Sequence, residues 1–366
     1  MKYLDEYKNQ GAAEQISKQI KLLSDKLYVK DKKINIMEVC GSHTMAIARY
    51  AIRELLPENI SLISGPGCPV CVTDTGYIDA AIELAEKGVI ITTFGDMINV
   101  PGTKKTLAIC RSEGCKVEIC YSPLNAIEIA EKNINKEVVF LAIGFETTMA
   151  PNIAMLEIAS KKNLKNISIL TAFKLIPPAL EALSMDPEIS IDAFLCPAHV
   201  SAIIGVKAYE PFVQKHKIPC LIASFEPVDI MLGIQGILQQ LADKDPHLEN
   251  QYARVVKYNG NEIAQQLFNK YLEEYDASWR GIGKIPKSGL KLKKEFAYFD
   301  ASAKHDVKIA VGKPNKACRC GDVLKGKINP SECPMFAKKC TPMNPVGPCM
   351  VSSEGSCAAY YKYLRK

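Results

Sequence analysis

Two features are missing from this 366-residue sequence, and each absence excludes a class of protein. No run of about 20 apolar residues occurs, although a membrane-spanning helix needs one. The N-terminal segment MKYLDEYKNQGAAEQISKQIKLL is charged and amphipathic, and it lacks the apolar core and cleavage site of a secretory signal. We therefore expect a soluble protein of the cytoplasm that does not bind a membrane.

The excess of one sign of charge is also small, with a net charge of +6, but the charge is unevenly distributed along the chain. From Ala301 to the end there are 12 Lys and Arg residues against 4 Asp and Glu, so this part carries +8 and the remainder −2. These basic residues are not interleaved with aromatic residues, as a stacking platform for nucleic acid requires. We expect them to stabilise an anionic metal–thiolate site, and we expect no nucleic-acid partner.

Cysteine, in contrast, is abundant, with 14 residues. In a reducing cytoplasm this number favours metal ligands or redox thiols over a framework of structural disulfides. Six of the 14 lie within the 40 residues 318–357, where Pro, Gly and Lys replace the apolar periodicity of an ordinary core. A bound metal centre can supply the stability that such a segment lacks.

Four of these six cysteines have a spacing that favours an iron–sulfur cluster. Intervals of 14, 6 and 16 residues separate Cys318, Cys333, Cys340 and Cys357. A structural zinc ion usually shows paired short CxxC knuckles, which this segment lacks, so zinc is the less favoured alternative. The two remaining thiols, Cys320 and Cys349, could form a disulfide beside the cluster.

Strand-like and helical patterns alternate through most of the chain. Continuous apolar runs of this kind are typical of parallel strands that helices cover on both faces, and the length exceeds that of a single core. We expect two Rossmann-like parallel-sheet α/β domains, over residues 1–150 and 151–290, and a small cysteine-rich iron–sulfur domain over 291–366. The predicted strands are INIMEVC, ISLISGP, GVIITTFG, KVEICYS, EVVFLAIGF, ISILTAF, DAFLCPAH, CLIASFEP and ARVVKY.

Polar and thiol side chains follow several of these strands directly. Ligands of open α/β sheets bind at the carboxyl ends of the strands, so these side chains are candidates for a site in one cleft between the domains. The candidates are Cys40 and His43 after INIMEV, Cys68 and Cys71 after ISLIS, Glu146 after VVFLAIGF, and His199 after DAFLCPA.

The thiols among these candidates permit two kinds of chemistry. Cys40 lies at a predicted helix N-terminus, which lowers a cysteine pKa and favours the thiolate needed for nucleophilic attack or metal ligation. His43, within one turn, could orient or deprotonate that thiol, although a buried cysteine and a hydrogen-bonded core histidine are the alternative. Cys68 and Cys71 have the CxxC spacing of thiol–disulfide oxidoreductases and of many metal sites, with a chance pair in a turn as the alternative.

The two remaining candidates are ambiguous. Glu146, beside Thr147 and Thr148, could serve as a general base, a metal ligand or a hydrogen-bond anchor, or the segment could simply cap the next helix. His199 in CPAHVS carries the same ambiguity.

Four further cysteines are assigned to packing rather than to chemistry. Free cysteines behave as small apolar side chains, and spacing alone proves little in this part of the chain. They are Cys110, Cys115, Cys120 and Cys220.

Along essentially its whole length the chain resembles the HypD family of hydrogenase maturation proteins. The motifs that carry the resemblance are MEVCGSHTMAIARY, GPGCPVCVT, TFGDMINVPG, GFETTMAPN, CPAHVSAIIG, FEPVDIMLGI, WRGIGKIPKSGL and the cysteine-rich tail. The resemblance implies a scaffold on which the Fe(CN)2CO group of [NiFe]-hydrogenases is assembled, with a HypC-type chaperone and a HypE-type cyanide donor as partners. It also implies two Rossmann-like domains and a cluster domain.

The resemblance further implies roles for particular thiols. The tail cysteines Cys318, Cys333, Cys340 and Cys357 would hold a [4Fe-4S] cluster, with Cys320 and Cys349 as a second redox pair. Cys40 would share the iron that carries cyanide and CO with a cysteine of the HypC partner, and Cys68 with Cys71 would be redox-active or iron-associated. No heptad repeat stands out, so we expect a monomer in transient complexes. An autonomous iron–sulfur thiol–disulfide oxidoreductase is the alternative function, and a zinc-stabilised binding module is a third.

Overall fold

The structure is a computed structural model that describes residues 10–364, and its strands form two separate sheets. The first sheet has the strand order β2-β1-β7-β8-β9 and is parallel throughout. Its strands are β1 (Ile34–Glu38), β2 (Ile60–Ser64), β7 (Ala193–Pro197), β8 (Cys220–Ala223) and β9 (Leu248–Asn250). An α/β fold with mainly parallel sheets is therefore confirmed.

The second sheet has the order β10-β11-β6-β5-β3-β4. Four of its strands are parallel, and an antiparallel hairpin of β10 and β11 extends it beyond β6. Its strands are β3 (Ile90–Thr93), β4 (Val117–Ile119), β5 (Val138–Gly144), β6 (Ile167–Lys174), β10 (Leu272–Trp279) and β11 (Gly283–Leu292). Every residue of β5 is buried, as expected for an inner parallel strand covered on both faces.

The predicted boundary at residue 150 is wrong, because each sheet takes strands from two separate stretches of the chain. β5 and β6 lie on either side of that boundary and are neighbours in one register, with Val138 opposite Ile167. In the first sheet, β1 pairs with β7 from the other side of the boundary, with Ile36 opposite Ala193. The physical reason is that an apolar run indicates a buried strand without indicating its partner.

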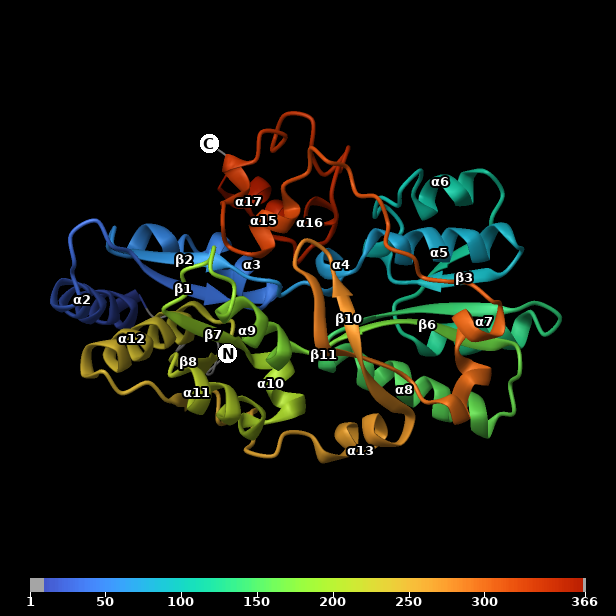
Figure 1. The fold of residues 1–366 in the computed structure, drawn as a ribbon, viewed down its shortest axis with the longest axis horizontal. Coiled ribbons are helices and arrows are strands. Elements are labelled where there is room, and N and C mark those ends of the chain that lie inside the picture. The colour runs from blue at the N-terminus through green and yellow to red at the C-terminus, as the bar shows by residue number, and fades with distance from the viewer. Residues whose placement is uncertain (1–9, 365–366) are drawn as a thin grey trace.

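Helices connect and cover the strands, and the longest lie against the sheets (Figure 1). The longer ones are α2 (Gln10–Lys26), α3 (Gly41–Arg49), α5 (Thr75–Glu86), α7 (Leu124–Lys132), α8 (Glu146–Lys161), α9 (Ile176–Ser184), α12 (Pro227–Asp243) and α13 (Glu262–Tyr271). The shorter ones are α4 (Pro69–Val72), α6 (Leu107–Ser112), α10 (Ala198–Ile204), α11 (Glu210–His216), α14 (Ala301–Lys304), α15 (Cys320–Leu324), α16 (Pro348–Val351) and α17 (Ser356–Tyr363). None of the helices in residues 10–364 has the length and apolarity to cross a bilayer.

The cysteine-rich tail lies over the region where the two sheets meet (Figure 1). α17 packs against α3, and α16 packs against α4. Because α3 and α4 directly follow β1 and β2, this packing places the tail at the carboxyl ends of those strands, where ligands of such sheets bind.

Candidate functional site

The four tail cysteines that the spacing singled out surround one small cavity. Its remaining walls are mainly apolar and include Val323, Met335, Phe336, Val346 and Met350. The thiols reach the cavity from four different places in the tail: Cys318 precedes α15, Cys333 follows a short 3-10 helix, Cys340 lies in a bridged loop, and Cys357 is in α17. The fold therefore gathers residues that are 39 positions apart in the sequence.

The chemistry of this cavity fits a thiolate-bound cluster. Burial, reinforced by the neighbouring tail thiols, raises the pKa values of Cys318 and Cys357, so a multivalent cation is needed to hold several thiolates together. A Cβ atom at Gly347 would lie 2.5 Å from Cys318 Sγ, so a side chain there would fill the space beside the thiol. The Val346 N–H donates a hydrogen bond to Cys340 Sγ at 3.4 Å. Within residues 10–364, no three His, Cys, Asp or Glu side chains are grouped tightly enough to hold a single metal ion.

The two other cysteines of the tail, Cys320 and Cys349, form a disulfide that borders the same cavity. Both cysteines are buried, and their Cα atoms are 6.5 Å apart. Cys349 lies in α16, the helix that packs against α4. The disulfide is thus placed between the tail cavity and the CxxC segment.

The CxxC cysteines lie at the two ends of the first turn of α4. Cys68 is the N-cap, and its sulfur accepts a hydrogen bond from the Cys71 N–H at 3.3 Å. The two sulfur atoms are 2.7 Å apart, and Cys71 is fully buried. The pKa of Cys71 is raised well above its usual range, mainly because the thiol is buried and to a smaller extent because the Cys68 sulfur is adjacent. The pair is therefore held as two neighbouring thiols in a dry environment.

Arg280, which sequence reasoning did not single out, closes the other end of α4. Its backbone N–H donates to the Val72 carbonyl at 2.8 Å, and its Nε donates to the Thr73 carbonyl at 2.8 Å. The residue is only 9% exposed, and burial lowers its pKa against the opposing effect of nearby groups that include Cys71 and Cys318. The signal available in the sequence was its place in the WRGIG motif, far from any cysteine.

Replacing Arg280 with methionine should destabilise the protein, because the buried carbonyl of Thr73 then loses its charged donor. We expect a loss of about 2 kcal/mol in the free energy of unfolding, measured by chemical denaturation under anaerobic conditions. Arg111, which is exposed on α6, offers a matched control, and Arg111→Met should change stability by less than about 0.5 kcal/mol. Equal stability of the two variants would show that Arg280 does not hold α4.

Cys40 is the N-cap of α3 and lies in a second cavity, between the two sheets and the tail. This cavity is also lined by Gly67, Pro69, Phe145, Thr148, His199 and Glu354. A Cβ atom at Gly67 would lie 2.3 Å from the backbone nitrogen of Cys40, so only glycine permits this contact. The Gly41 N–H donates to the Gly67 carbonyl at 3.1 Å. The CxxC loop therefore touches the Cys40 loop directly.

The expectation that a helix N-terminus lowers the pKa of Cys40 is wrong in its net direction. The backbone N–H groups of Ser42 and His43 do favour the thiolate, but burial and the nearby Glu354 carboxylate outweigh them. The result is a pKa raised to about 12. In the form described here Cys40 is thus a protonated thiol, and a bound cation is needed to favour its thiolate.

Glu354 is a second site residue that sequence reasoning missed. Ser42 Oγ donates a hydrogen bond to Glu354 Oε1 at 2.8 Å. The preceding residues are fastened as well, because Asp96 accepts hydrogen bonds from the Ser353 N–H at 3.1 Å and from Ser352 Oγ at 3.3 Å. The segment just before Cys357 therefore closes over Cys40, which the cysteine spacing of the tail did not indicate.

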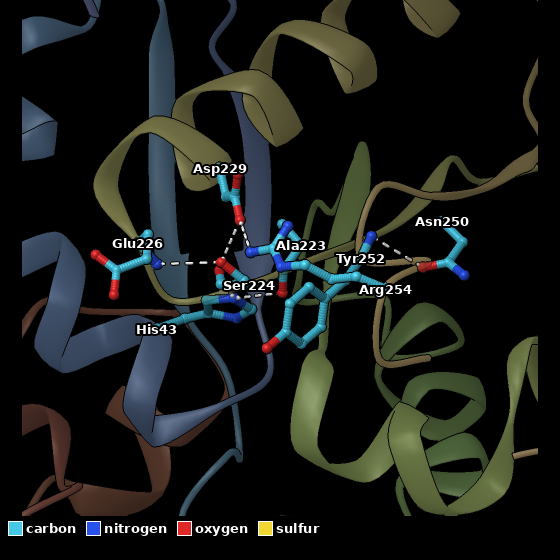
Figure 2. Close-up of polar contacts among 8 residues, drawn as sticks. All are labelled: His43, Ala223, Ser224, Glu226, Asp229, Asn250, Tyr252 and Arg254. Carbon is cyan, nitrogen blue, oxygen red and sulfur yellow. Dashed lines mark hydrogen bonds and ion pairs between the residues drawn. The ribbon is translucent and has the colours of Figure 1, made fainter. Parts of the chain in front are cut away.

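His43 is directed away from the Cys40 cavity and toward the end of β8. Its Nε2 lies 3.2 Å from the Ala223 carbonyl and 3.0 Å from the Ser224 carbonyl, so this nitrogen carries the proton and donates. Beyond it, Ser224 Oγ donates to Asp229, which pairs with Arg254 at 2.6 Å (Figure 2). Burial lowers the pKa of His43 to about 4. The contacts described for this ring position α3 against β8.

The other two candidates differ in where they lie. His199 is exposed and lines the Cys40 cavity. Glu146 is the buried first residue of α8 and stands behind the cavity wall, where its Oε1 accepts a hydrogen bond from the Ile176 N–H at 3.0 Å. The structure thus gives Glu146 an anchoring contact between α8 and α9, and burial raises its pKa to about 7.

Glu146→Gln should reduce the pH dependence of stability between about pH 4.5 and pH 7. The carboxyl group titrates near 4.5 when unfolded and near 7 when folded, so the unfolded state loses its proton first and stability falls as the pH rises between these values. The loss that Glu146 contributes is about 3 kcal/mol, and the amide, which cannot ionise, should abolish this contribution. Buried Glu38, whose pKa is also raised to about 7, keeps its own contribution in the variant. Denaturation midpoints measured from pH 5 to pH 8 test this, with exposed Glu274→Gln as the control. Parallel pH profiles for wild type and Glu146→Gln would contradict it.

Strands of the two α/β sheets end at buried cysteines, and the tail with its cysteine-lined cavity covers these strand ends. The chain matches the model of the HypD family, described as a hydrogenase formation hypA family, over residues 11–364. It is 42% identical to a hydrogenase maturation factor HypD of Azotobacter vinelandii, covering 100% of this chain and 98% of that one. It is 40% identical to that of Escherichia coli, covering 100% and 99% of the two chains. A protein of Methanocaldococcus jannaschii named for hydrogenase expression and formation is 44% identical over 93% of this chain and 95% of its own. The chain belongs to the HypD family.

Proposed function

We propose that this protein is a scaffold on which the Fe(CN)2CO group of a [NiFe]-hydrogenase is assembled, in the cytoplasm. In this proposal Cys318, Cys333, Cys340 and Cys357 hold a resident [4Fe-4S] cluster, and Cys40 binds the iron that is being assembled. A HypC-type chaperone supplies another ligand to that iron, and a HypE-type protein supplies cyanide. Membership of the HypD family supports the maturation role.

The observation that carries the proposal is that segments packed against one another place two cysteine pairs between the tail cavity and the Cys40 cavity. The Cys320–Cys349 disulfide borders the tail cavity, and its helix α16 packs on the CxxC helix α4. The loop before α4 contacts the backbone of Cys40 through Gly67. Such an arrangement suits the passage of electrons from one cavity to the other, which neither a packing role nor a binding role requires.

The two cysteine pairs can store the electrons that pass between the two cavities. When bound, a [4Fe-4S] cluster supplies electrons one at a time, whereas opening one disulfide to two thiols consumes two electrons and two protons. Cys68 and Cys71 hold their sulfur atoms 2.7 Å apart, so closing or opening a disulfide between them needs only a small movement. Their burial keeps both states away from small oxidants in the solvent.

Cys40 is suited to bind the iron as cargo. Only the thiolate is a metal ligand, so iron binding must displace the proton that the raised pKa retains there. A thiolate is a soft donor, which suits low-spin iron that also carries cyanide and CO. The exposed His199 marks the side from which a partner can reach this cavity.

Metal content and infrared spectra test the proposal. Protein purified anaerobically should contain iron and acid-labile sulfide in equal amounts and little zinc, and its complex with a HypC-type partner should show cyanide and CO bands. Zinc without sulfide would overturn the cluster assignment in favour of a zinc-stabilised module. Iron and sulfide without cyanide and CO bands in that complex would overturn the scaffold role.

An autonomous thiol–disulfide oxidoreductase is the alternative function. It predicts multiple turnovers on an external disulfide substrate, which must then reach Cys68 or Cys71. Cys68 is 3% exposed and Cys71 is fully buried, so the described conformation favours internal electron transfer over an external substrate. Steady turnover of a small disulfide by the purified protein would favour this alternative.

A further inference from the structure

A separate pair of thiols, Cys110 and Cys115, meets at the end of α6. In Figure 1 this helix lies well away from α15, α16 and α17. The Gly114 N–H donates to the Arg111 carbonyl at 3.1 Å, and the Cys115 N–H donates to the Cys110 carbonyl at 3.1 Å. With Gly114 at φ +104°, these two bonds define a Schellman motif. A Schellman motif commonly places the side chains of the two residues joined by its longer hydrogen bond in contact. In this protein those two residues are Cys110 and Cys115.

The two thiols differ in their access to solvent. Cys110 is fully buried in the main core, whereas Cys115 is partly exposed and packs against that core. The pKa of Cys110 is raised, mainly by burial and next by the neighbouring Cys115 thiol. This second cause agrees with the closeness of the two thiols. An exposed thiol beside a buried one is the arrangement in which the first reacts and the second resolves the product.

Cys115 also lines a surface pocket that carries unbalanced positive charge. Lys105 in this pocket pairs with Glu86 at 2.7 Å and with Glu113 at 2.5 Å. Lys116 and Lys136 lie next to each other in the same pocket, and this closeness lowers the pKa of Lys136. Among residues 10–364 neither of these two ammonium groups has a carboxylate partner.

We propose that Cys110 and Cys115 form a redox site whose substrate is a low-molecular-weight disulfide bearing carboxylate groups. The paired thiols supply the chemistry, and Lys116 with Lys136 selects the negative charge. In this proposal the two cysteines take part in chemistry in addition to the packing that the sequence predicts for them. This site is independent of the maturation function proposed above, since it lies on a different part of the fold.

The reaction balances as a dithiol–disulfide exchange. Cys115 Sγ attacks one sulfur of the external disulfide, whose S–S bond breaks and releases one thiol that takes up the proton lost by Cys115. Cys110 Sγ then attacks the sulfur of Cys115 in this mixed disulfide, and a second thiol leaves with the proton of Cys110. Two protein thiols are oxidised by two electrons, and one external disulfide is reduced to two thiols.

The test uses oxidised glutathione as the anionic disulfide and cystamine as the cationic one, each added to the full chain under anaerobic conditions. Trypsin cuts after Lys105, Arg111 and Lys116, so the two cysteines fall on separate peptides, TLAICR and SEGCK. A disulfide between them appears in mass spectra as a linked peptide pair. We expect oxidised glutathione to produce this pair at least about tenfold faster than cystamine at low salt, with the preference reduced at high salt.

Three variants separate the parts of the proposal. Cys110→Ser should stop at a glutathione adduct on SEGCK, and Cys115→Ser should leave TLAICR unmodified. Lys116→Gln combined with Lys136→Gln should remove the preference for glutathione while leaving the cysteines able to react. In this variant trypsin no longer cuts after residue 116, so the Cys115 peptide extends to Lys132. Failure of the wild-type chain to give the linked pair, or equal modification of Cys110 in Cys115→Ser, would overturn the redox site. Equal rates with the two disulfides would overturn the proposed carboxylate-bearing substrate.

Discussion

Cys40→Ala is expected to leave the fold and the iron–sulfur absorbance unchanged and to abolish the cyanide and CO infrared bands of the complex with a HypC-type partner. Cys40 lines a cavity at the end of β1 and does not border the tail cavity, so its loss should not disturb the four tail thiols. Alanine is a small side chain like the cysteine that it replaces, so we expect α3 still to begin at this position. The effect is therefore confined to the ligand for the assembled iron.

A cysteine away from the site provides the control for this variant. Cys120 is buried at the end of β4, and Cys120→Ala should retain both the absorbance and the infrared bands. Cyanide and CO bands that persist at wild-type intensity in the Cys40→Ala complex would remove Cys40 as the iron ligand. Loss of the iron–sulfur absorbance as well would mean that the two cavities are not independent.

The second large effect is expected for Cys340→Ala, which should lose most of the bound iron, the labile sulfide and the visible absorbance. Cys340 is the buried member of the four tail thiols, and its sulfur faces a cavity with mainly apolar walls. Besides the four tail thiols, the cysteines that line this cavity are Cys320 and Cys349, and these two are joined in a disulfide. A substitute ligand from the described chain would therefore first require that bond to be reduced.

The same variant should lower the apparent stability of the tail. Metal binding supplies folding free energy to segments with little core, and the α16 and α17 region depends on the same cavity. Proteolysis in the tail should become faster in Cys340→Ala, whereas Cys120→Ala should match the wild type. An unchanged spectrum and an unchanged iron content would exclude Cys340 from the ligand set.

The sequence determined the strand content of the sheets wherever strands are continuous apolar runs. The first eight predicted strands correspond to β1 through β8, whose inward positions are buried on the sheet faces. The ninth prediction, residues 253–258, is wrong, because this segment forms turns and β9 lies at 248–250 instead. The hairpin of β10 and β11 was missed, since buried and exposed positions are mixed along β10 and no continuous apolar run marks it.

The thiols of the site were also evident from the sequence, because local spacing brings Cys68 beside Cys71 and sets the tail cysteines apart from the rest of the chain. Only the tertiary structure decided what surrounds them. Arg280 and Glu354 come from distant segments that close on α4 and on Cys40, so no local pattern could place them. The protonation of Cys40 follows the same rule: burial is a property of the whole fold, and it outweighs the local effect of a helix N-terminus.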